Sequence, residues 1–474
     1  MKKILCICIS IILISPSFID DLNVTEKEKV GKPGFFSELL SGQFFIDMLY
    51  GDKKVSVDIW DEDLTISSVQ AGYQQINVKI NKNSIQKLNS DFPDTEVEYL
   101  YNTTSYSYIS LEMRKDNIAQ KFWSTILNNK VTLADKDYVE KISLNRQLSL
   151  VKPQDYADKN SIARTTYELC KDYNILDTGY TGNNISVAVL DTGIRWTHDG
   201  FRNTTIYNET KVIDESPNDL NGHGTHVSGI LAGSNVTLAE TRMRGVAPNV
   251  TLHSIKVLDS EGRGTEDAIV KGIQSAIDNS VDIVSMSLGG RISYNSVLHD
   301  VIQYAVGKGI VVVAAAGNSA SVTSAQPASW EGVISVEALS EDKHIAPYTC
   351  LYGDVMAEGT NITSLNYHDS DGALTLSGTS MATPFVSGCI ALLLEAQPTL
   401  RGRPIQVTKY LKSTGSPVPK TQTEDLIARM FTPANYRYDT RDININNLLK
   451  LKELETDRQK ISDIGTQMFR NRGI

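Results

Sequence analysis

Three short segments of the chain each carry one residue that could take part in acyl transfer. Asp191-Thr-Gly follows an apolar run, His223 stands in Asn-Gly-His-Gly-Thr-His, and Ser380 stands in Gly-Thr-Ser-Met-Ala-Thr-Pro. A serine hydroxyl is a weak nucleophile at neutral pH, so it needs a neighbouring base, and the base needs an acid that orients it. Histidine and aspartate fill these two roles. We therefore expect Asp191, His223 and Ser380 to form a catalytic triad.

A fourth segment supplies a group that could stabilise negative charge on a substrate. Asn318 follows an apolar run that ends in Ala-Ala-Ala-Gly. Its side-chain amide could donate a hydrogen bond to the oxyanion of a tetrahedral intermediate. Ser380 leads into an apolar helix, so free backbone N–H groups and the positive end of the helix dipole would lie beside it.

Each of these residues has a plainer structural interpretation when it is taken alone. Asp191 and Ser380 could cap a turn or a helix. His223 and His226 could be core residues, or half of a metal site, because their spacing is one that a metal can use. The occurrence of all four segments in one chain, in the order Asp, His, Asn, Ser, favours the catalytic interpretation.

Together the four segments resemble the subtilase family of serine proteases. The resemblance implies that His223 is the general base and that His226 packs beneath it. It also implies that Asp191 fixes the tautomer of His223, that Ser380 attacks the substrate carbonyl, and that Asn318 forms the oxyanion hole with the backbone N–H of Ser380.

The same resemblance implies that the substrate binds as an extended strand between two protein segments. These segments are Ser287, Leu288, Gly289 and Gly290 on one side, and Ala315, Ala316 and Gly317 on the other. The floor of the primary pocket should lie near Ser319 and Ala325. Because no acid stands at those positions, we expect medium or large apolar residues before the cleaved bond.

The elements that must hold these residues are strands that alternate with helices. Residues 185–190, 281–286 and 310–315 are continuous apolar runs rich in β-branched residues. Such runs indicate parallel strands that are buried on both faces. The fold class predicted for residues 151–420 is therefore α/β, a subtilisin-like three-layer domain with a mostly parallel central sheet.

The segment before this domain predicts a small α+β domain. From Ile76 onward the pattern is β-α-β-β-α-β, a ferredoxin-like arrangement over about residues 55–146 that includes a helix over 115–127. It resembles the family's propeptide, which implies a folding chaperone and transient inhibitor whose tail lies in the active site. We expect self-cleavage between Leu144 and Arg164, in a polar linker that spans 146–184.

The first residues predict export. Lys2 and Lys3 precede an apolar run over 4–14, and Ser15-Pro16-Ser17 offers small residues for signal cleavage. An uncleaved anchor is the alternative. The predicted organisation is a signal peptide over 1–17, a propeptide over 18–150, a catalytic domain over 151–420 and a C-terminal extension over 421–474, with a charged helix over 446–463.

The remaining features narrow the partners and cofactors. A formal net charge of −10 argues against nucleic acid, because phosphate binding needs clustered Lys and Arg. No cofactor is expected for catalysis. The structural calcium that many relatives hold is in doubt, because Asp199-Gly200 stands where they have Pro-Asp and the loop 233–245 is long. Glu358, at a position where relatives have Pro, is interpreted as a surface change.

Three cysteines, Cys170, Cys350 and Cys389, remain outside the signal segment. We interpret them as small buried apolar residues, with one disulfide left open.

The chain is thus expected to be a secreted serine endopeptidase that acts through an acyl-enzyme and is made as a self-processed zymogen. Its partners would be protein or peptide substrates and its own propeptide, with no stable membrane span after signal cleavage. One alternative is a processing protease dedicated to a single precursor peptide. The other is a non-catalytic binding protein of the same shape, which would predict a damaged triad.

Overall fold

The structure is a computed structural model, and it describes most of the chain between residues 56 and 449. The predicted signal segment and the predicted helix over 115–127 lie outside the described residues, as does most of the predicted helix over 446–463. The described residues are 56–58, 73–93, 95–114, 133, 136–151, 163–290, 292, 294, 296–321, 323–418, 441–444 and 447–449.

The N-terminal domain is a five-stranded sheet in the order β1-β5-β2-β4-β3. Its last four strands have the ferredoxin-like order, and one face carries the apolar residues of each strand alternately, as in the buried series Ile76, Val78 and Ile80. The elements are β1 (Ser56–Asp58), β2 (Tyr73–Asn81), α6 (Ile85–Asp91), β3 (Glu96–Asn102), β4 (Tyr106–Arg114) and β5 (Val139–Leu144).

The second domain is built on a nine-stranded sheet in the order β21-β22-β18-β17-β16-β14-β8-β12-β9. All neighbouring strands are parallel except β21 and β22. This confirms the predicted mostly parallel sheet. The strands are β8 (Ser186–Asp191), β9 (Thr205–Thr210), β12 (Thr251–Lys256), β14 (Ile283–Met286), β16 (Val311–Ala315), β17 (Val333–Leu339), β18 (Val355–Glu358), β21 (Ser416–Pro417) and β22 (Arg441–Asp442).

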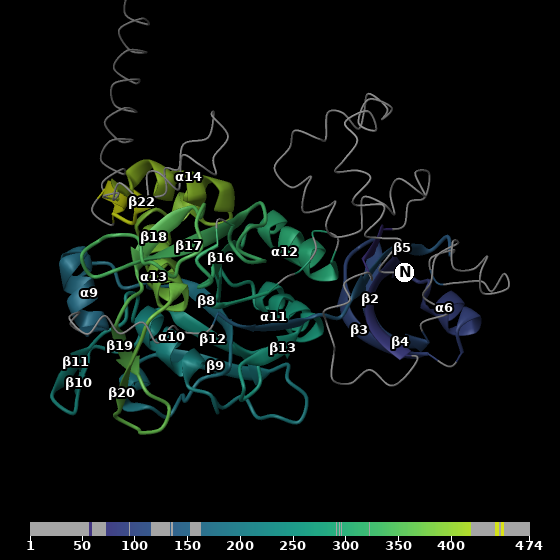
Figure 1. Ribbon diagram of the computed structural model, residues 1–474, viewed down its shortest axis with the longest axis horizontal. Helices are drawn as coiled ribbons and strands as arrows, with labels where there is room; N and C mark the ends of the chain where they lie inside the picture. Colours follow the sequence, from purple (N-terminus) through teal and green to yellow (C-terminus); the bar gives the residue numbers. More distant parts are fainter. Residues whose placement is uncertain are drawn as a thin grey trace, which may run out of the picture.

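Helices cover both faces of this sheet and make three layers (Figure 1). Helices α10 and α13 pack with one apolar cluster, and α11 and α12 pack with the other. Helix α13 is long and apolar enough to cross a membrane, but it is almost entirely buried in the core. The helices are α9 (Thr166–Asp172), η2 (Ile175–Asp177), η3 (Asp199–Phe201), α10 (His223–Ala232), α11 (Glu266–Asp278), α12 (Val297–Gly307), α13 (Thr379–Ala396), η4 (Pro398–Leu400) and α14 (Pro404–Thr414).

Three small sheets complete the second domain. One is the hairpin of β10 (Val236–Leu238) and β11 (Thr241–Met243). The second joins β20 (Ala373–Leu376), β19 (Ile362–Leu365) and β7 (Arg164–Thr165). The third places β6 (Gln147–Leu150) between β13 (Arg263–Thr265) and β15 (Leu288–Gly289).

The sheet of the N-terminal domain lies against α11 and α12 (Figure 1). Asp300 on α12 pairs with Lys141 at 2.6 Å and with Lys79 at 3.2 Å. Beyond this sheet the chain enters the second domain as β6, with Leu148 and Leu150 buried. The linker predicted over 146–184 is therefore wrong at 147–150, because strands β13 and β15 supply the pairing partners that the local sequence does not reveal. It is also wrong at 164–177, where β7, α9 and η2 lie.

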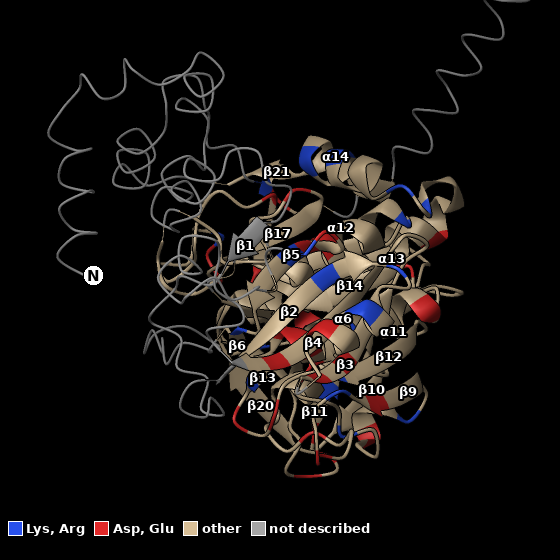
Figure 2. Ribbon diagram, turned by 90° about the vertical axis from the view of Figure 1, so that its right-hand side faces the viewer, with Lys and Arg blue, Asp and Glu red and all other residues tan. Residues whose placement is uncertain are grey.

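The C-terminal segment joins the edge of the large sheet, where it meets a buried ionic cluster. Glu358 is 2% exposed and pairs with Arg164 and Lys343, each at 2.6 Å. Lys343 also lies 3.6 Å from Asp442 on β22. The interpretation of Glu358 as a surface change is therefore wrong. Elsewhere Lys and Arg are mixed with Asp and Glu over the surface (Figure 2).

Candidate active site

Asp191 and His223 form a buried pair at the carboxyl end of β8. Asp191 is the last residue of β8, and His223 is the first residue of α10. His223 Nδ1 lies 2.9 Å from Asp191 Oδ1 and 3.0 Å from Oδ2. A carboxylate only accepts hydrogen bonds, so the proton of His223 belongs on Nδ1 and the lone pair on Nε2. This is the tautomer that a general base needs.

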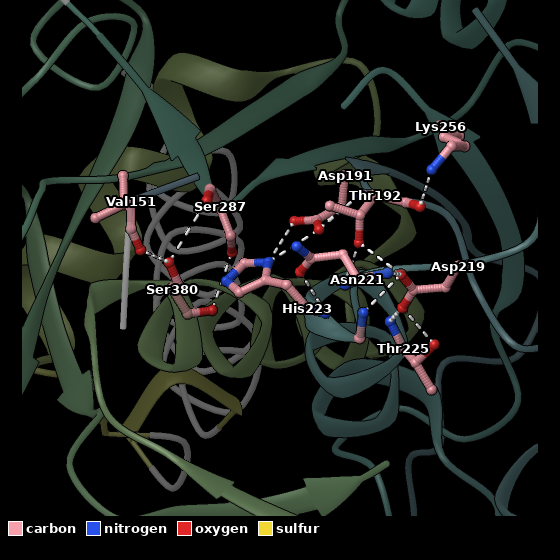
Figure 3. A network of polar contacts seen from close by, with 12 residues as sticks. Val151, Asp191, Thr192, Asp219, Asn221, His223, Thr225, Lys256, Ser287 and Ser380 are labelled. Atoms are coloured by element: carbon pink, nitrogen blue, oxygen red, sulfur yellow. Dashed lines mark hydrogen bonds and ion pairs between the residues drawn. The ribbon is translucent and has the colours of Figure 1, made fainter. Parts of the chain in front are cut away.

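Asp219 connects the end of strand β8 to the turn that carries His223 through hydrogen bonds (Figure 3). It is 5% exposed. One of its oxygens accepts hydrogen bonds from Thr192 Oγ1 at 2.9 Å, Asn221 N at 3.0 Å and Gly222 N at 2.8 Å. The other oxygen accepts from Thr225 N at 2.8 Å and Oγ1 at 2.6 Å. The sequence interpretation missed this residue, although an acid four residues before His223 is a readable signal.

A buried lysine supports the same turn from the neighbouring strand. Lys256 is fully buried, and its Nζ donates to Thr192 O at 2.7 Å and pairs with Glu215 at 3.0 Å. A buried charge is costly unless it is paired and hydrogen-bonded. These two contacts therefore fix the loop that follows Asp191.

Ser380 lies in the first turn of α13, next to the imidazole of His223 (Figure 3). Helix α13 begins at Thr379, so the first backbone N–H groups of the helix lie around the serine. Ser287 Oγ donates to the backbone oxygen of Ser380 at 2.9 Å and holds this turn against the loop after β14. The serine hydroxyl is thus at the positive end of a long helix.

Asn318 is oriented by Thr379, another residue that the sequence interpretation missed. The Asn318 Oδ1 accepts from Thr379 N and from Thr379 Oγ1, each at 2.9 Å. The amide nitrogen therefore faces the opposite way, towards Gly378. A Cβ at Gly378 would lie 2.8 Å from Asn318 Nδ2, so a side chain at this position would displace the amide.

The strand β6 runs along the site and ends at Ser380. Ser380 Oγ donates to Val151 O at 3.0 Å and lies 3.4 Å from Ser287 O. Val151 N donates to Ser287 O at 3.4 Å. Among the described residues His223 Nε2 is buried without a hydrogen-bond partner. The hydroxyl therefore faces the carbonyl of Val151 rather than the base.

One of the two predicted substrate-binding segments pairs with strand β6, and the other continues from the end of strand β16. Leu288 and Gly289 form β15, which pairs with Leu150 and Ser149. Ala315 ends β16, and the predicted wall continues through Ala316 and Gly317. Gly290 bridges to Gln326, which brings the loop that contains Ala325 against β15.

Cys350 closes the back of this wall. Its Sγ would lie 3.0 Å from a Cβ at Gly317, and Ser319 Oγ lies 3.3 Å from the sulfur. Cys350 N donates to Gly317 O at 2.8 Å. The sequence interpretation placed Ser319 at the pocket and named Cys350 only as a buried apolar residue, because the two lie thirty-one positions apart in the chain.

His226 lies beneath the site in a neutral state. Its Nε2 lies 2.9 Å from Leu374 O and 3.2 Å from Ile362 O. Carbonyls only accept, so Nε2 carries the proton. Burial, with a smaller contribution from the nearby His223, lowers the pKa of His226 to about 3. The three cysteines Cys170, Cys350 and Cys389 are all free thiols and buried.

At the position where many relatives have the calcium-ligating aspartate, this chain has Gly200, which offers no side-chain oxygen. Asp199 is half-exposed and lies 3.9 Å from Arg202. The loop 233–245 forms the β10–β11 hairpin, with positive φ at Ala239 and Glu240. Within the described part of the chain, no three His, Cys, Asp or Glu side chains come together in a way that could hold a metal ion.

Comparison with known proteins agrees with this geometry. The subtilase family model matches residues 182–431. Subtilisin DY from Bacillus licheniformis is 42% identical over 245 residues, which cover 50% of this chain and 86% of that protein. Subtilisin NAT from Bacillus subtilis subsp. natto is 38% identical over 247 residues, which cover 50% of this chain and 62% of that protein.

Among solved structures, fervidolysin from Fervidobacterium pennivorans, a keratinolytic enzyme related to subtilisin, superposes with a TM-score of 0.62 at 23% identity. The superposition covers 83% of this chain and 62% of that one, and it concerns the fold alone. The parallel sheet and the relatives define a serine-type endopeptidase. The chain belongs to the subtilase family, whose catalysis needs no cofactor.

Proposed function

We propose that the protein is a secreted serine endopeptidase, made as a precursor that cleaves itself, with Asp191, His223 and Ser380 as its catalytic triad. The observation that carries the proposal is the buried Asp191–His223 pair beside Ser380, with the carbonyl of Val151 held on the serine hydroxyl at 3.0 Å. The two alternatives are a protease dedicated to one precursor and a non-catalytic binding protein.

The reaction follows from the positions of these groups. Ser380 Oγ attacks the carbonyl carbon while His223 Nε2 takes its proton, and Asp191 stabilises the resulting imidazolium. Asn318 Nδ2 and the Ser380 N–H donate to the oxyanion. Collapse of the intermediate breaks the C–N bond, and His223 gives its proton to the leaving amine. Water then hydrolyses the Ser380 ester by the same route in reverse.

The N-terminal domain is proposed to be the inhibitor of this site. Its sheet rests on α11 and α12, and its tail occupies the cleft as β6. Ser143 Oγ accepts from Val297 N at 3.2 Å, and Asn145 Oδ1 accepts from Asp267 N at 3.3 Å. These contacts cap the N-termini of both helices, which supports a role for the domain in folding as well as inhibition. Export rests on the signal-like residues 1–17.

The experiment compares the intact masses of wild type, Ser380→Ala and Ser387→Ala after expression and export. Ser387 is the matched control, because it lies buried in the same helix and, among the described residues, its hydroxyl contacts Thr383 O and Ser285 Oγ, away from Asp191, His223 and Ser380. Wild type and Ser387→Ala should be processed, and Ser380→Ala should stay full length. Its kcat should fall by on the order of a millionfold, the loss known for the nucleophile of subtilisin. Processing of Ser380→Ala in a purified preparation would overturn the proposal.

A further inference from the structure

We propose that this enzyme selects substrates that carry valine immediately before the cleaved bond and leucine at the second and fourth positions before it, as in Leu148-Ser149-Leu150-Val151. The precursor would accordingly be cut after Val151. The inference rests on the proposed function, because it assigns the substrate of the same site.

The register of β6 identifies the bond. Val151 O accepts from Ser380 Oγ, so the carbonyl of residue 151 is the one that the nucleophile faces (Figure 3). Val151 N donates to Ser287 O, which fixes the residue from its other side. Within the described tail, Val151 O is the one carbonyl oxygen that accepts a hydrogen bond from Ser380. The bond that follows Val151 is therefore in position for attack.

The tail is held by hydrogen bonds between backbone atoms, which a substrate of any sequence could form. Ser149 pairs with Arg263 on one side and with Gly289 on the other. Leu150 N donates to Gly262 O at 2.8 Å. Strand pairing of this kind provides affinity without selecting side chains, so the selection must come from the pockets.

Two leucines of the tail are buried against the enzyme, and the residue between them is partly exposed. Leu148 is 1% exposed and Leu150 is 9% exposed, whereas Ser149 is only partly buried. Both leucines belong to the apolar cluster that contains Leu258 and Leu288. Leu150 lies directly over Gly262, where a Cβ would meet its Cδ1 at 2.6 Å. A shorter side chain at either leucine position would leave an apolar cavity.

The primary pocket is built from small groups and suits a side chain of moderate size. Val151 Cγ2 lies 3.6 Å from the position of a Cβ at Gly289. Ala325 Cβ lies 3.2 Å from that same position and 3.6 Å from a Cβ at Gly317, so it stands between the two walls. Cys350 closes the space behind Gly317. An apolar, uncharged pocket of this kind accepts valine and excludes Lys and Arg.

The test uses the enzyme expressed as the full chain and allowed to process itself, with quenched fluorogenic peptides that have the sequence of residues 147–155. The parent peptide should be cut after Val151, as located by mass spectrometry. Peptides with Leu148→Ala or Leu150→Ala should lose roughly tenfold or more in kcat/KM, because each leucine buries its side chain in the complex. The control peptide with Ser149→Ala should stay within about threefold, and Val151→Arg should not be cut at that bond.

The outcomes separate this inference from the proposed function. Equal kcat/KM for the parent and both alanine peptides, or cleavage at another bond, overturns the inference. If the same preparation still hydrolyses a denatured protein such as casein, and the Ser380→Ala protein does not, the proposed function survives that result. If neither the peptides nor casein is cut, the proposed function fails as well.

Discussion

Replacing Asp219 with asparagine should slow the chemical step without weakening substrate binding. The change keeps one acceptor oxygen, which can still serve Thr192, Asn221 and Gly222. It turns the second oxygen into an NH2 group that faces Thr225 N, which also donates. Two hydrogen bonds to a buried carboxylate are lost, and each such bond contributes about 1.5–3 kcal/mol. Water cannot replace them, because Asp219 is 5% exposed.

The lost contacts position the turn that carries His223, so part of their energy should appear in the transition state. If about half of it does, kcat falls by on the order of a hundredfold, which corresponds to about 2.7 kcal/mol. KM should stay within about threefold, because Asp219 has no contact with β6 among the recorded hydrogen bonds. Asp219 is thus a positioning residue.

The assay measures kcat and KM on the peptide with the sequence of residues 147–155. Active enzyme is counted by titration with a covalent serine-directed inhibitor, so that misfolded protein does not lower kcat. Asp214→Asn is the matched control, since Asp214 is exposed and lies in the same stretch of chain. The reasoning is refuted if Asp219→Asn lowers Tm but leaves kcat per active site unchanged, or if the loss appears in KM alone.

Two further predictions concern the surroundings of the site. Burial raises the pKa of Asp267 to about 6 beneath the N-terminal domain, against 3.8 for a free side chain. Between these two pKa values the complex holds a proton on Asp267 that the separated enzyme lacks. The affinity of the enzyme for the added N-terminal domain should therefore fall as the pH rises from about 4 to 6, and it should level off above pH 6. Calorimetry would measure this dependence on pH, and Asp267→Asn should remove it. Separately, Glu358→Ala removes one of the two acidic partners of Arg164 and of Lys343, which keep Asp172 and Asp442. It should lower the free energy of unfolding by about 2 kcal/mol, measured by urea denaturation; an unchanged midpoint would show that the cluster contributes nothing.

Much of the fold was predictable because its signals are local. The apolar runs that became β8, β14 and β16 have β-branched side chains that fit strands buried on both faces. The candidate site residues were predicted from a related kind of signal. Asp191, His223 and Ser380 each stand beside glycine or threonine in a turn that leads from or into such an element, and this local chemistry is written in the sequence.

The predictions that were wrong concern residues whose partners are distant in the chain. Residues 147–150 form a strand because β13 and β15, more than a hundred positions away, pair with both of its edges. Glu358 is buried because Arg164 and Lys343 converge on it from two other segments. Neither set of contacts leaves a periodic pattern in the sequence. The polar stretch 147–150 was therefore interpreted as part of a linker, and the isolated Glu358 as a surface residue.

Because Ser380 Oγ donates a hydrogen bond to Val151 O, the serine hydrogen must move before a peptide bond can be broken. A carbonyl oxygen only accepts, so the serine hydrogen points at the substrate oxygen and away from His223 Nε2. Attack requires this hydrogen on the base instead. Rotation about the Cα–Cβ bond of Ser380 would deliver it, since staggered rotamers of a hydroxyl side chain interconvert readily. The carbonyl oxygen would then lose its bond to the serine hydroxyl and need the amide of Asn318. Thr379 holds that amide by its oxygen, so the orientation of the Asn318 side chain is fixed by the protein itself. With the tail in the cleft, a rotation of the Ser380 side chain therefore separates the observed arrangement from one in which His223 could take the serine proton.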